Sequence, residues 1–169
     1  MVALSRKNKI AIAAIATLAV VLGIAIPYVG AQTAANNSIS NLKTLNAKGY
    51  IYQAIDSNTI KYYPANLTLS LQPTTTNGTV RMFDVAGGTV VANGISYTIT
   101  SGTGGYLTVR HAVLLQAQGT GPDGQSVTLK LAGQYSYSWL AHRLVFKIGA
   151  NLQTDDSNYT LLMRAAVRT

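Results

Sequence analysis

Two histidines are the side chains of this sequence best suited to acid–base or metal chemistry. His111 lies in YLTVRHAVLLQAQ, where apolar residues alternate, so a strand there places its imidazole on the apolar face. A buried imidazole can be a ligand or a base, but the pattern favours a core histidine, or one that a bulge turns outward. His142, in SWLAHRL, is expected at a bend between two strands. Two distant histidines without Cys or Glu predict no metal site.

Aromatic residues form the second candidate group. Tyr135, Tyr137 and Trp139 alternate along QYSYSWL, and exposed aromatic rows bind sugars, peptides or partner strands. The same parity includes Leu129 and Leu131, which favours a core face with phenol groups at its rim. The weak ligand-binding candidates are therefore His111, Tyr135, Tyr137 and Trp139.

Catalytic constellations are missing from the sequence. All five acidic residues are Asp, and there is no Cys for a thiolate nucleophile or a disulfide. Asp155 and Asp156 with Asn158 could contribute to a calcium site, but a solvated loop is favoured. No nucleophile elbow, phosphate loop or dinucleotide fingerprint occurs. We therefore expect a protein that is not an enzyme and needs no cofactor or metal.

Asparagine-linked glycans are a further expectation for an exported chain. Four asparagines begin Asn-x-Ser/Thr triplets and are candidate glycosylation sites: Asn36, Asn66, Asn77 and Asn158. Asn77 precedes Gly78 at an expected turn, which makes it the most accessible of them.

The first thirty residues carry a targeting signal. Ile10 to Val29 is uncharged and spans about 30 Å as a helix, the thickness of a bilayer core. Arg6, Lys7 and Lys9 precede it, which places the N-terminus in the cytoplasm and the rest of the chain outside.

Cleavage and retention of this segment are both open. Val29 and Ala31 occupy the small-residue positions before Gln32, and Pro27 ends the helix upstream, so Ala31 and Gln32 flank a candidate signal-peptidase site. The length of the apolar run instead favours a retained anchor, which contacts the membrane through Ile10 to Val29. Either way the rest of the chain is extracytoplasmic, secreted or anchored in the cytoplasmic membrane.

The remaining chain divides into a short linker and one β domain. Residues 32–47 are polar and possess a three-residue apolar spacing that suits a linker with some helix. From residue 48 to 169 the apolar period is two, which predicts antiparallel strands. We expect nine: 49–56, 65–72, 79–85, 89–92, 95–100, 106–118, 125–138, 143–149 and 159–168, with a turn at Gly87-Gly88 and a flexible loop at SGTGG (101–105). This number favours an antiparallel β-sandwich, jelly-roll or immunoglobulin-like, over a barrel-like jelly roll.

Charge gives the class of partner. The formal net charge is +8, and from Gln32 onward ten Lys and Arg face five Asp. These cations are spread along the chain, whereas nucleic-acid-binding proteins cluster theirs, so no nucleic-acid partner is expected. Attraction to an acidic envelope surface follows from the long-range field. Nothing in the sequence predicts an oligomeric state.

The composition and order of the segments resemble those of a known group of proteins. An N-terminal apolar helix followed by Asn-, Thr- and Gly-rich strands, as in NLTLSLQPTTTNGTVRMFDVAGGTVVANGISYTITSG, resembles uncharacterised exported β-domain proteins of ammonia-oxidising archaea. The resemblance implies an envelope location and no catalytic residue. We expect a non-enzymatic envelope protein that acts through protein or polymer contacts at exposed edge strands, the alternative being an extracytoplasmic module that binds glycan or metal.

Overall fold

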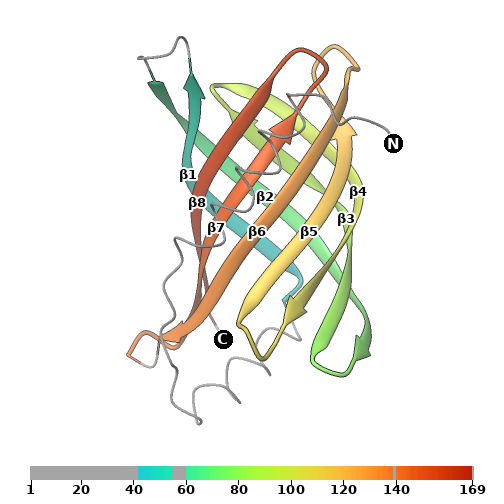
Figure 1. Cartoon of the computed structure of the whole chain (residues 1–169), viewed down its shortest axis with the longest axis vertical. Coiled ribbons are helices and arrows are strands. Elements are labelled where there is room, and N and C mark those ends of the chain that lie inside the picture. Colours follow the sequence, from blue (N-terminus) through green and yellow to red (C-terminus); the bar gives the residue numbers. More distant parts are fainter. Residues whose placement is uncertain (1–41, 55–59, 139, 169) are drawn as a thin grey trace, which may run out of the picture.

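The computed structural model describes residues 42–54, 60–138 and 140–168, which form eight antiparallel strands in one sheet. Each strand pairs with the next, and β8 pairs back with β1, so the sheet closes into a barrel (Figure 1). The strands are β1 (Thr44–Ala54), β2 (Ile60–Asn77), β3 (Val80–Ala92), β4 (Ile95–Leu107), β5 (Ala112–Thr120), β6 (Ser126–Ser138), β7 (Arg143–Gln153) and β8 (Asn158–Arg168). The predicted all-β antiparallel class is confirmed.

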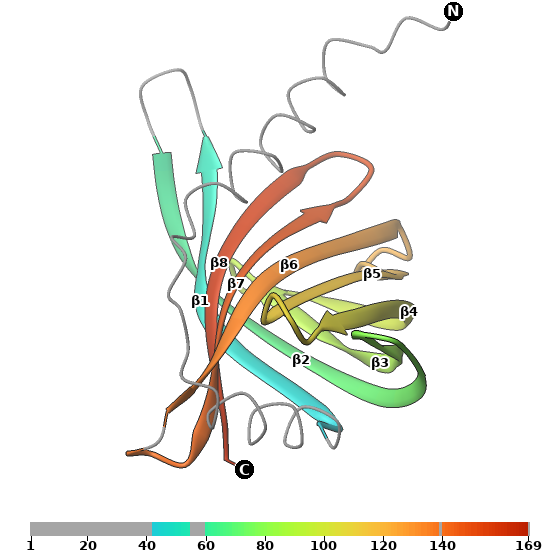
Figure 2. The ribbon, with the colours of Figure 1, turned by 60° about the horizontal axis from the view of Figure 1, so that its bottom comes forward.

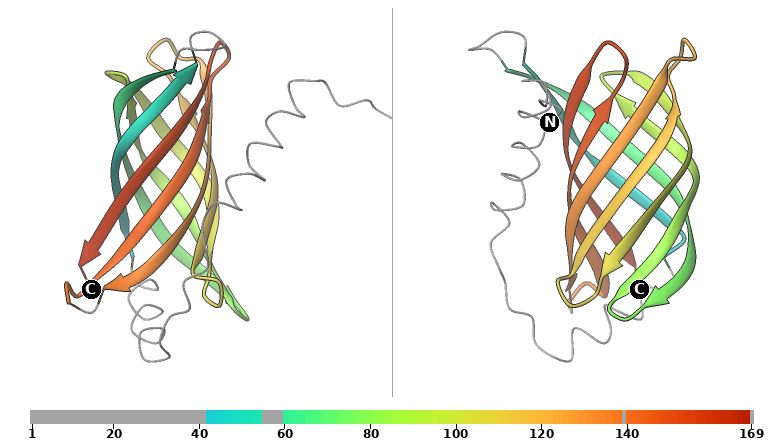
Figure 3. Two further views of the ribbon diagram at one scale, coloured as in Figure 1. Left: turned by 60° about the vertical axis from the view of Figure 1, so that its left-hand side comes forward. Right: turned by 45° about the vertical axis from the view of Figure 1, so that its right-hand side comes forward.

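The predicted β-sandwich is wrong, because one sheet closes on itself where two facing sheets were expected. Residues 47–52 of β1 pair with residues 160–165 of β8, which joins the first and last strands. Figure 3 shows the tilted strands following one another round the wall. Alternation predicts that one face of each strand is apolar. That face is buried in a sandwich by a second sheet and in a barrel by the same sheet curling round, so the pattern does not distinguish the two folds. Closure also covers most of the free strand edges that were expected to bind partners, and it leaves residues 60–64 of β2 without a partner on the β3 side.

The interior of the barrel is the hydrophobic core. Strand β5 illustrates the pattern, since Val113, Leu115 and Ala117 are buried while Leu114 and Gln116 between them are exposed. An eight-stranded barrel has an interior that side chains are just able to fill. The largest side chains below 2 % exposure are Phe83, Phe146, Leu45, Ile51, Leu67, Leu69, Ile99, Leu129, Leu144, Leu152 and Leu161. Burying each of them contributes about 1.5–3 kcal/mol.

A bulge in β3 adjoins the pair Gly87 and Gly88, where a turn was predicted, and Ala86 is the residue without a partner on β2. The expected strands 79–85 and 89–92 are one strand, and its register with β2 shifts between Ser70 and Leu71. A β-carbon on Gly88 would collide with the carbonyl oxygen of Thr68. Glycine is therefore required for the close approach of β2 and β3, and the bulge bends the strand round the barrel.

Two further glycines in β4 replace an expected loop, SGTGG (101–105), with strand. A β-carbon on Gly104 would lie 2.5 Å from Cζ of Phe83 and 2.7 Å from Cβ of Leu115. The glycine therefore leaves inner space for the Phe83 ring, which is 2 % exposed. Small residues opposite large ones fit the limited interior of a small barrel.

The connections β2–β3, β4–β5 and β6–β7 lie at one end of the barrel, which we call the aromatic end. Rings from four strands pack there: Phe83, Tyr106, Tyr135 and Phe146. The expected strand 106–118 is broken at this end by a turn through residues 108–111, so β5 begins only at Ala112.

The N-terminal boundary of the barrel lies before the predicted residue 48. Strand β1 begins at Thr44, with Leu42 and Leu45 buried, so the end of the expected 32–47 linker belongs to the barrel. The predicted helix from Ile10 to Val29 and the candidate cleavage residues Ala31 and Gln32 lie outside the described residues. Within the described ranges there is no helix with the length and apolarity needed to cross a membrane.

Candidate functional site

His111 lies in the turn between β4 and β5, which corrects its expected place within a strand. Its φ of 49° is left-handed, a conformation that ends the strand. The half-buried imidazole packs edge-on against Tyr135, with ring centroids 5.4 Å apart. His142 also has positive φ (44°) and lies in the β6–β7 turn, as predicted.

The aromatic row on β6 points into the barrel. Tyr135 is only 3 % exposed and packs on the core, and half-buried Tyr137 lies against the same core. The Tyr137 hydroxyl lies 3.5 Å from Nδ1 of His142. The core reading of this face is confirmed, and Trp139 lies outside the described residues. The structure thus brings His111 and Tyr135 together, and places Tyr137 beside His142.

Three of the four candidate glycosylation sites are exposed. Asn66 lies on the outer face of β2, Asn77 at the end of β2, and Asn158 at the start of β8. Asn151 donates a hydrogen bond from Nδ2 to Oδ1 of Asn158 at 2.5 Å. Asn36 is outside the described residues. The described side chains include no cluster of three or more His, Cys, Asp or Glu that could hold a metal ion.

Barrel closure assembles a row of three cations on the outer wall. Lys147 on β7 is the register partner of Arg164 on β8, and Arg164 is the partner of Lys48 on β1. All three side chains are exposed, and their neighbours along the strands are buried apart from the half-buried Gly49, so the three point outward. We call this set the basic row.

A second pair of cations lies beside the basic row. Arg143 on β7 faces Arg168 on β8, and the pair Val145 and Ala166 separates it from the row. Four residues along a strand correspond to about 13 Å, which is the separation between this pair and the row. None of these cations, nor any in the row, forms an ion pair with an acid in the described part of the chain.

Like charges directly opposite each other on neighbouring strands destabilise a sheet. The basic row contains two such pairs, Lys147–Arg164 and Arg164–Lys48, and Arg143–Arg168 is a third. Among the described residues, no acid offsets the positive potential of this part of the wall, which an anionic partner would neutralise.

A groove lies between these cations. Its volume is about 550 Å³, and it is lined by Lys48, Ser138, Ala141, Arg143, Val145, Arg164, Ala165 and Ala166. Three cations line it together with small and apolar residues. No carboxylate of the described residues lines it, and this volume is in the range of small-ligand sites.

Exposed aromatic side chains continue the outer wall beyond the basic row. Tyr50 follows Lys48 by two residues on the outer face of β1, and its register partner on β8 is Leu162. Tyr52 and Tyr62 form an edge-on pair with centroids 4.9 Å apart. Tyr50 is 57 % exposed and Tyr62 60 % exposed, which is unusual for rings of this size.

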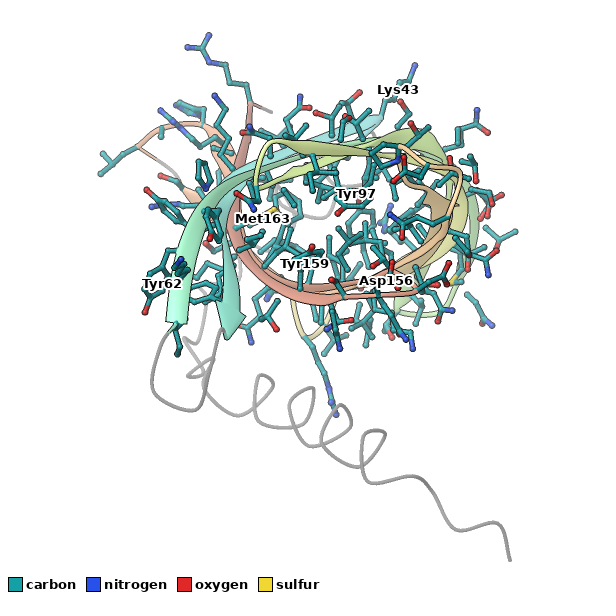
Figure 4. All side chains as sticks on the ribbon, turned by 90° about the horizontal axis from the view of Figure 1, so that it is seen from above. Lys43, Tyr62, Tyr97, Asp156, Tyr159 and Met163 are labelled. Atoms are coloured by element: carbon teal, nitrogen blue, oxygen red, sulfur yellow. The ribbon has the colours of Figure 1, made fainter. Side chains whose placement is uncertain are left out.

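These tyrosines lie on a hairpin that extends past the rest of the barrel. Strand β2 pairs with β1 from Ile60 but with β3 only from Ala65. Figure 2 shows the β1–β2 hairpin projecting from the wall, and Figure 4 shows Tyr62 on its outer side. We call Tyr50, Tyr52 and Tyr62 the tyrosine patch.

Sequence reasoning missed the basic row because its members are far apart along the chain. Only the β7–β8 hairpin register brings Lys147 to Arg164, and only closure brings Lys48 to both. The alternation of Arg164 with buried Met163 and Ala165 does indicate its outward direction. Alternation could not predict which residue of β1 lies opposite Arg164 across the β1–β8 pairing, which we call the seam.

The chain matches no protein-family model, no curated protein and no solved structure. The groove and the surfaces beside it are therefore the basis for a functional proposal.

Proposed function

We propose that this protein is a non-enzymatic, extracytoplasmic component of the cell envelope that binds an acidic polysaccharide in the groove on its outer wall. The observation that carries the proposal is the basic row of Lys147, Arg164 and Lys48. Three adjacent cations without an acidic neighbour in the described chain favour a ligand with repeated negative charges. Carboxylate or sulfate groups on successive sugars would supply them.

The cations supply attraction and the groove supplies shape. Arginine forms paired hydrogen bonds with a carboxylate or sulfate, and both Arg143 and Arg164 line the groove. A polymer chain entering the groove would lie over Val145 and Ala166 between the two sets of cations. A bilayer surface is flat, so the concave site favours a chain-like ligand over a lipid surface.

The tyrosine patch supports a sugar polymer over other polyanions. Tyr50 adjoins Lys48 on the outer face of β1, and exposed phenol rings offer an apolar surface with a polar tip. Sugar rings stack on such surfaces while their hydroxyls bond the rim. A ligand that extends from the groove onto Tyr50 and Tyr62 would use both kinds of contact.

The extracytoplasmic location is motivated by the sequence. The apolar segment from Ile10 to Val29 after a basic flank predicts export, and the Asn-x-Ser/Thr triplets suit an exported chain. The resemblance to exported β-domain proteins of archaea supports the same location. Outer residues such as Thr68 and Gln116 suit a wall that faces water.

The test is binding of sulfated dextran to the full-length protein in neutral detergent, measured by isothermal titration calorimetry. We expect binding that weakens as salt rises and that neutral dextran does not reproduce. The double variant Lys48→Gln/Arg164→Gln should lose at least tenfold in affinity. Lys130→Gln/Lys61→Gln removes the same charge from strands β6 and β2 and should bind nearly as the wild type does.

Two outcomes would overturn this proposal. Equal loss of affinity in both double variants would mean that net charge alone drives binding. Vesicles with anionic lipid that bind tightly, while sulfated dextran does not bind, would assign the groove to a membrane surface.

A further inference from the structure

One stretch of strand edge stays uncovered in the closed barrel. Residues 60–64 of β2 pair with β1, but within the described residues they have no partner on the β3 side, because that pairing begins at Ala65. Figure 2 shows this part of the β1–β2 hairpin extending beyond the neighbouring strands. Unpaired N–H and C=O groups along an edge are a template for another strand. We call residues 60–64 the free edge.

The side chains of the free edge favour contact with a protein strand. Ile60 is 55 % exposed and Tyr62 is 60 % exposed, and both lie on the outer face of β2. β-branched and aromatic residues are favoured in paired strands. The free edge contains no acid, and its one charge is Lys61. In strand addition, main-chain hydrogen bonds supply affinity and alternate side chains supply specificity, and the free edge offers both.

A second copy of this chain fits the free edge, because the edge is complementary to itself. Two free edges can lie antiparallel about a two-fold axis, so that each contributes the same groups. With the axis at Tyr62, the Tyr62 rings of the two copies lie opposite each other on the outer face. Lys61 then faces Tyr63 of the second copy, which pairs a cation with a ring. Ile60 faces Pro64 at either end of the pairing.

The lysine and the proline of the free edge select this register over its neighbours. An axis at Lys61 would place two lysines directly opposite each other, which destabilises an antiparallel pair. An axis at Tyr63 would bring Lys61 opposite Ala65, whose edge is already paired with β3. Lysine and proline limit indiscriminate pairing of an edge. Pro64 lies at the end of the pairing about Tyr62, so its missing N–H affects only the last position.

We propose that two copies of this protein associate through their free edges, so that the two β1–β2 hairpins form one antiparallel sheet across a two-fold axis at Tyr62. Strand pairing uses backbone groups, so the rings of the tyrosine patch stay on the outer wall. The association does not depend on the polysaccharide proposal. Two grooves on one dimer would also raise the avidity for a polymer, and only this consequence rests on the proposed function.

A single engineered cysteine tests the register, because the sequence has no cysteine of its own. Directly opposed residues of antiparallel strands have Cα atoms about 4.5–5.5 Å apart, within the range that a disulfide bridges. Mild oxidation of full-length Tyr62→Cys in neutral detergent should convert most of the protein to a covalent dimer. Ile60→Cys is the matched control, because Ile60 is nearly as exposed but would lie about 13 Å from Ile60 of the second copy. Thr68→Cys, on the outer face where β3 already pairs, should also stay monomeric on a non-reducing gel.

Charges placed at the two-fold axis test the association without a cross-link. Tyr62→Lys and Tyr62→Glu each put two like charges opposite each other, so each should raise the dissociation constant of the dimer about tenfold in sedimentation velocity. An equal mixture of the two variants should recover the dimer, because opposite charges then meet at the axis. The position is exposed, so both variants should keep the wild-type Tm, which shows that the barrel is folded.

The proposal is overturned if the wild-type protein sediments only as a monomer throughout the concentration series, or if Tyr62→Cys forms no more covalent dimer than Ile60→Cys. It is equally overturned if a dimer persists unchanged in both Tyr62→Lys and Tyr62→Glu. That last result would assign the association to another surface or to the apolar segment from Ile10 to Val29 within the micelle.

Discussion

Lys48 on β1 and Arg164 on β8 lie directly opposite each other across the seam that closes the barrel. They are 116 positions apart in the numbering, and only closure makes them neighbours. Two like charges at such a position destabilise the sheet, so the pairing that makes this surface positive also lowers the stability of the barrel. This relationship links the fold to the proposed function, because the same pairing that completes the barrel completes the basic row.

Reversing one charge of the row should strengthen the fold while weakening binding. Arg164→Glu converts both like-charge pairs, with Lys48 and with Lys147, into attractive pairs. We expect the free energy of unfolding to rise by about 0.5–1 kcal/mol in urea denaturation at low salt. Affinity for sulfated dextran should fall at least tenfold in the same variant.

The matched control for this charge reversal is Lys130→Glu on β6. Its register partners are the neutral Gln116 and Asn151, so no like-charge pair is relieved and stability should change little. A destabilised Arg164→Glu protein, or one that binds sulfated dextran at wild-type affinity, would contradict the role assigned to the row.

The inner glycine of β4 should be intolerant of any side chain. Gly104→Ala places a methyl group against the Phe83 ring and Leu115, and we expect a loss of about 1–3 kcal/mol in unfolding free energy. Gly105→Ala is the neighbouring control, since its β-carbon would meet the flexible Met82 side chain at 3.2 Å. Phe83→Leu should recover part of the stability that Gly104→Ala loses, because the smaller side chain makes room for the added methyl group. If the changes in unfolding free energy of the two variants simply add, a direct clash between residues 104 and 83 is contradicted.

The sequence predicted much of this local structure and little of the closure. Alternation in Val113, Leu115 and Ala117 correctly predicted an apolar face, since period two follows from strand geometry. Gly87 and Gly88 were predicted to form a turn because a glycine pair permits either a turn or a bulge. The Thr68 carbonyl on β2 approaches Gly88 closely, and this contact with another strand, which the local sequence does not show, favours the bulge over the turn.

The candidate site shows the same division. Tyr135 was predicted to face the core from its parity, and the barrel confirms it. His111 was expected within a strand, because the alternation around it runs unbroken through a four-residue turn. Lys48 could not be predicted as a site residue, because a single lysine on the outer face of a strand is common and its neighbour Arg164 is known only from the closed barrel.

The fold should lose stability at alkaline pH as its buried phenols ionise. Burial, with the hydrogen bond and charge of Tyr159, raises the pKa of Tyr97 from 10.0 to about 12, and burial raises that of Tyr135 to about 12. Figure 4 shows Tyr97 and Tyr159 inside the ring of strands. A tyrosine in the unfolded chain ionises near pH 10, whereas the same tyrosine in the fold ionises only near pH 12. The buried neutral phenol therefore contributes its full stability below pH 10, and the free energy of unfolding falls as the pH rises from 10 to 12.

Urea denaturation at a series of pH values checks this dependence, together with the phenolate absorbance of the folded protein. Tyr97→Phe and Tyr135→Phe should each flatten the decline in unfolding free energy above pH 10. A decline of unchanged slope in both variants would show that other groups govern alkaline unfolding.

The most direct test of the central claim is where an acidic sugar chain binds. A short sulfated dextran oligosaccharide, added to isotope-labelled full-length protein in detergent, should shift the amide resonances of Lys48, Val145, Arg164 and Ala166 more than those elsewhere on the wall. Resonances that shift only at the opposite face, or shifts spread evenly over every cation, would contradict a binding site built by the β1–β8 seam.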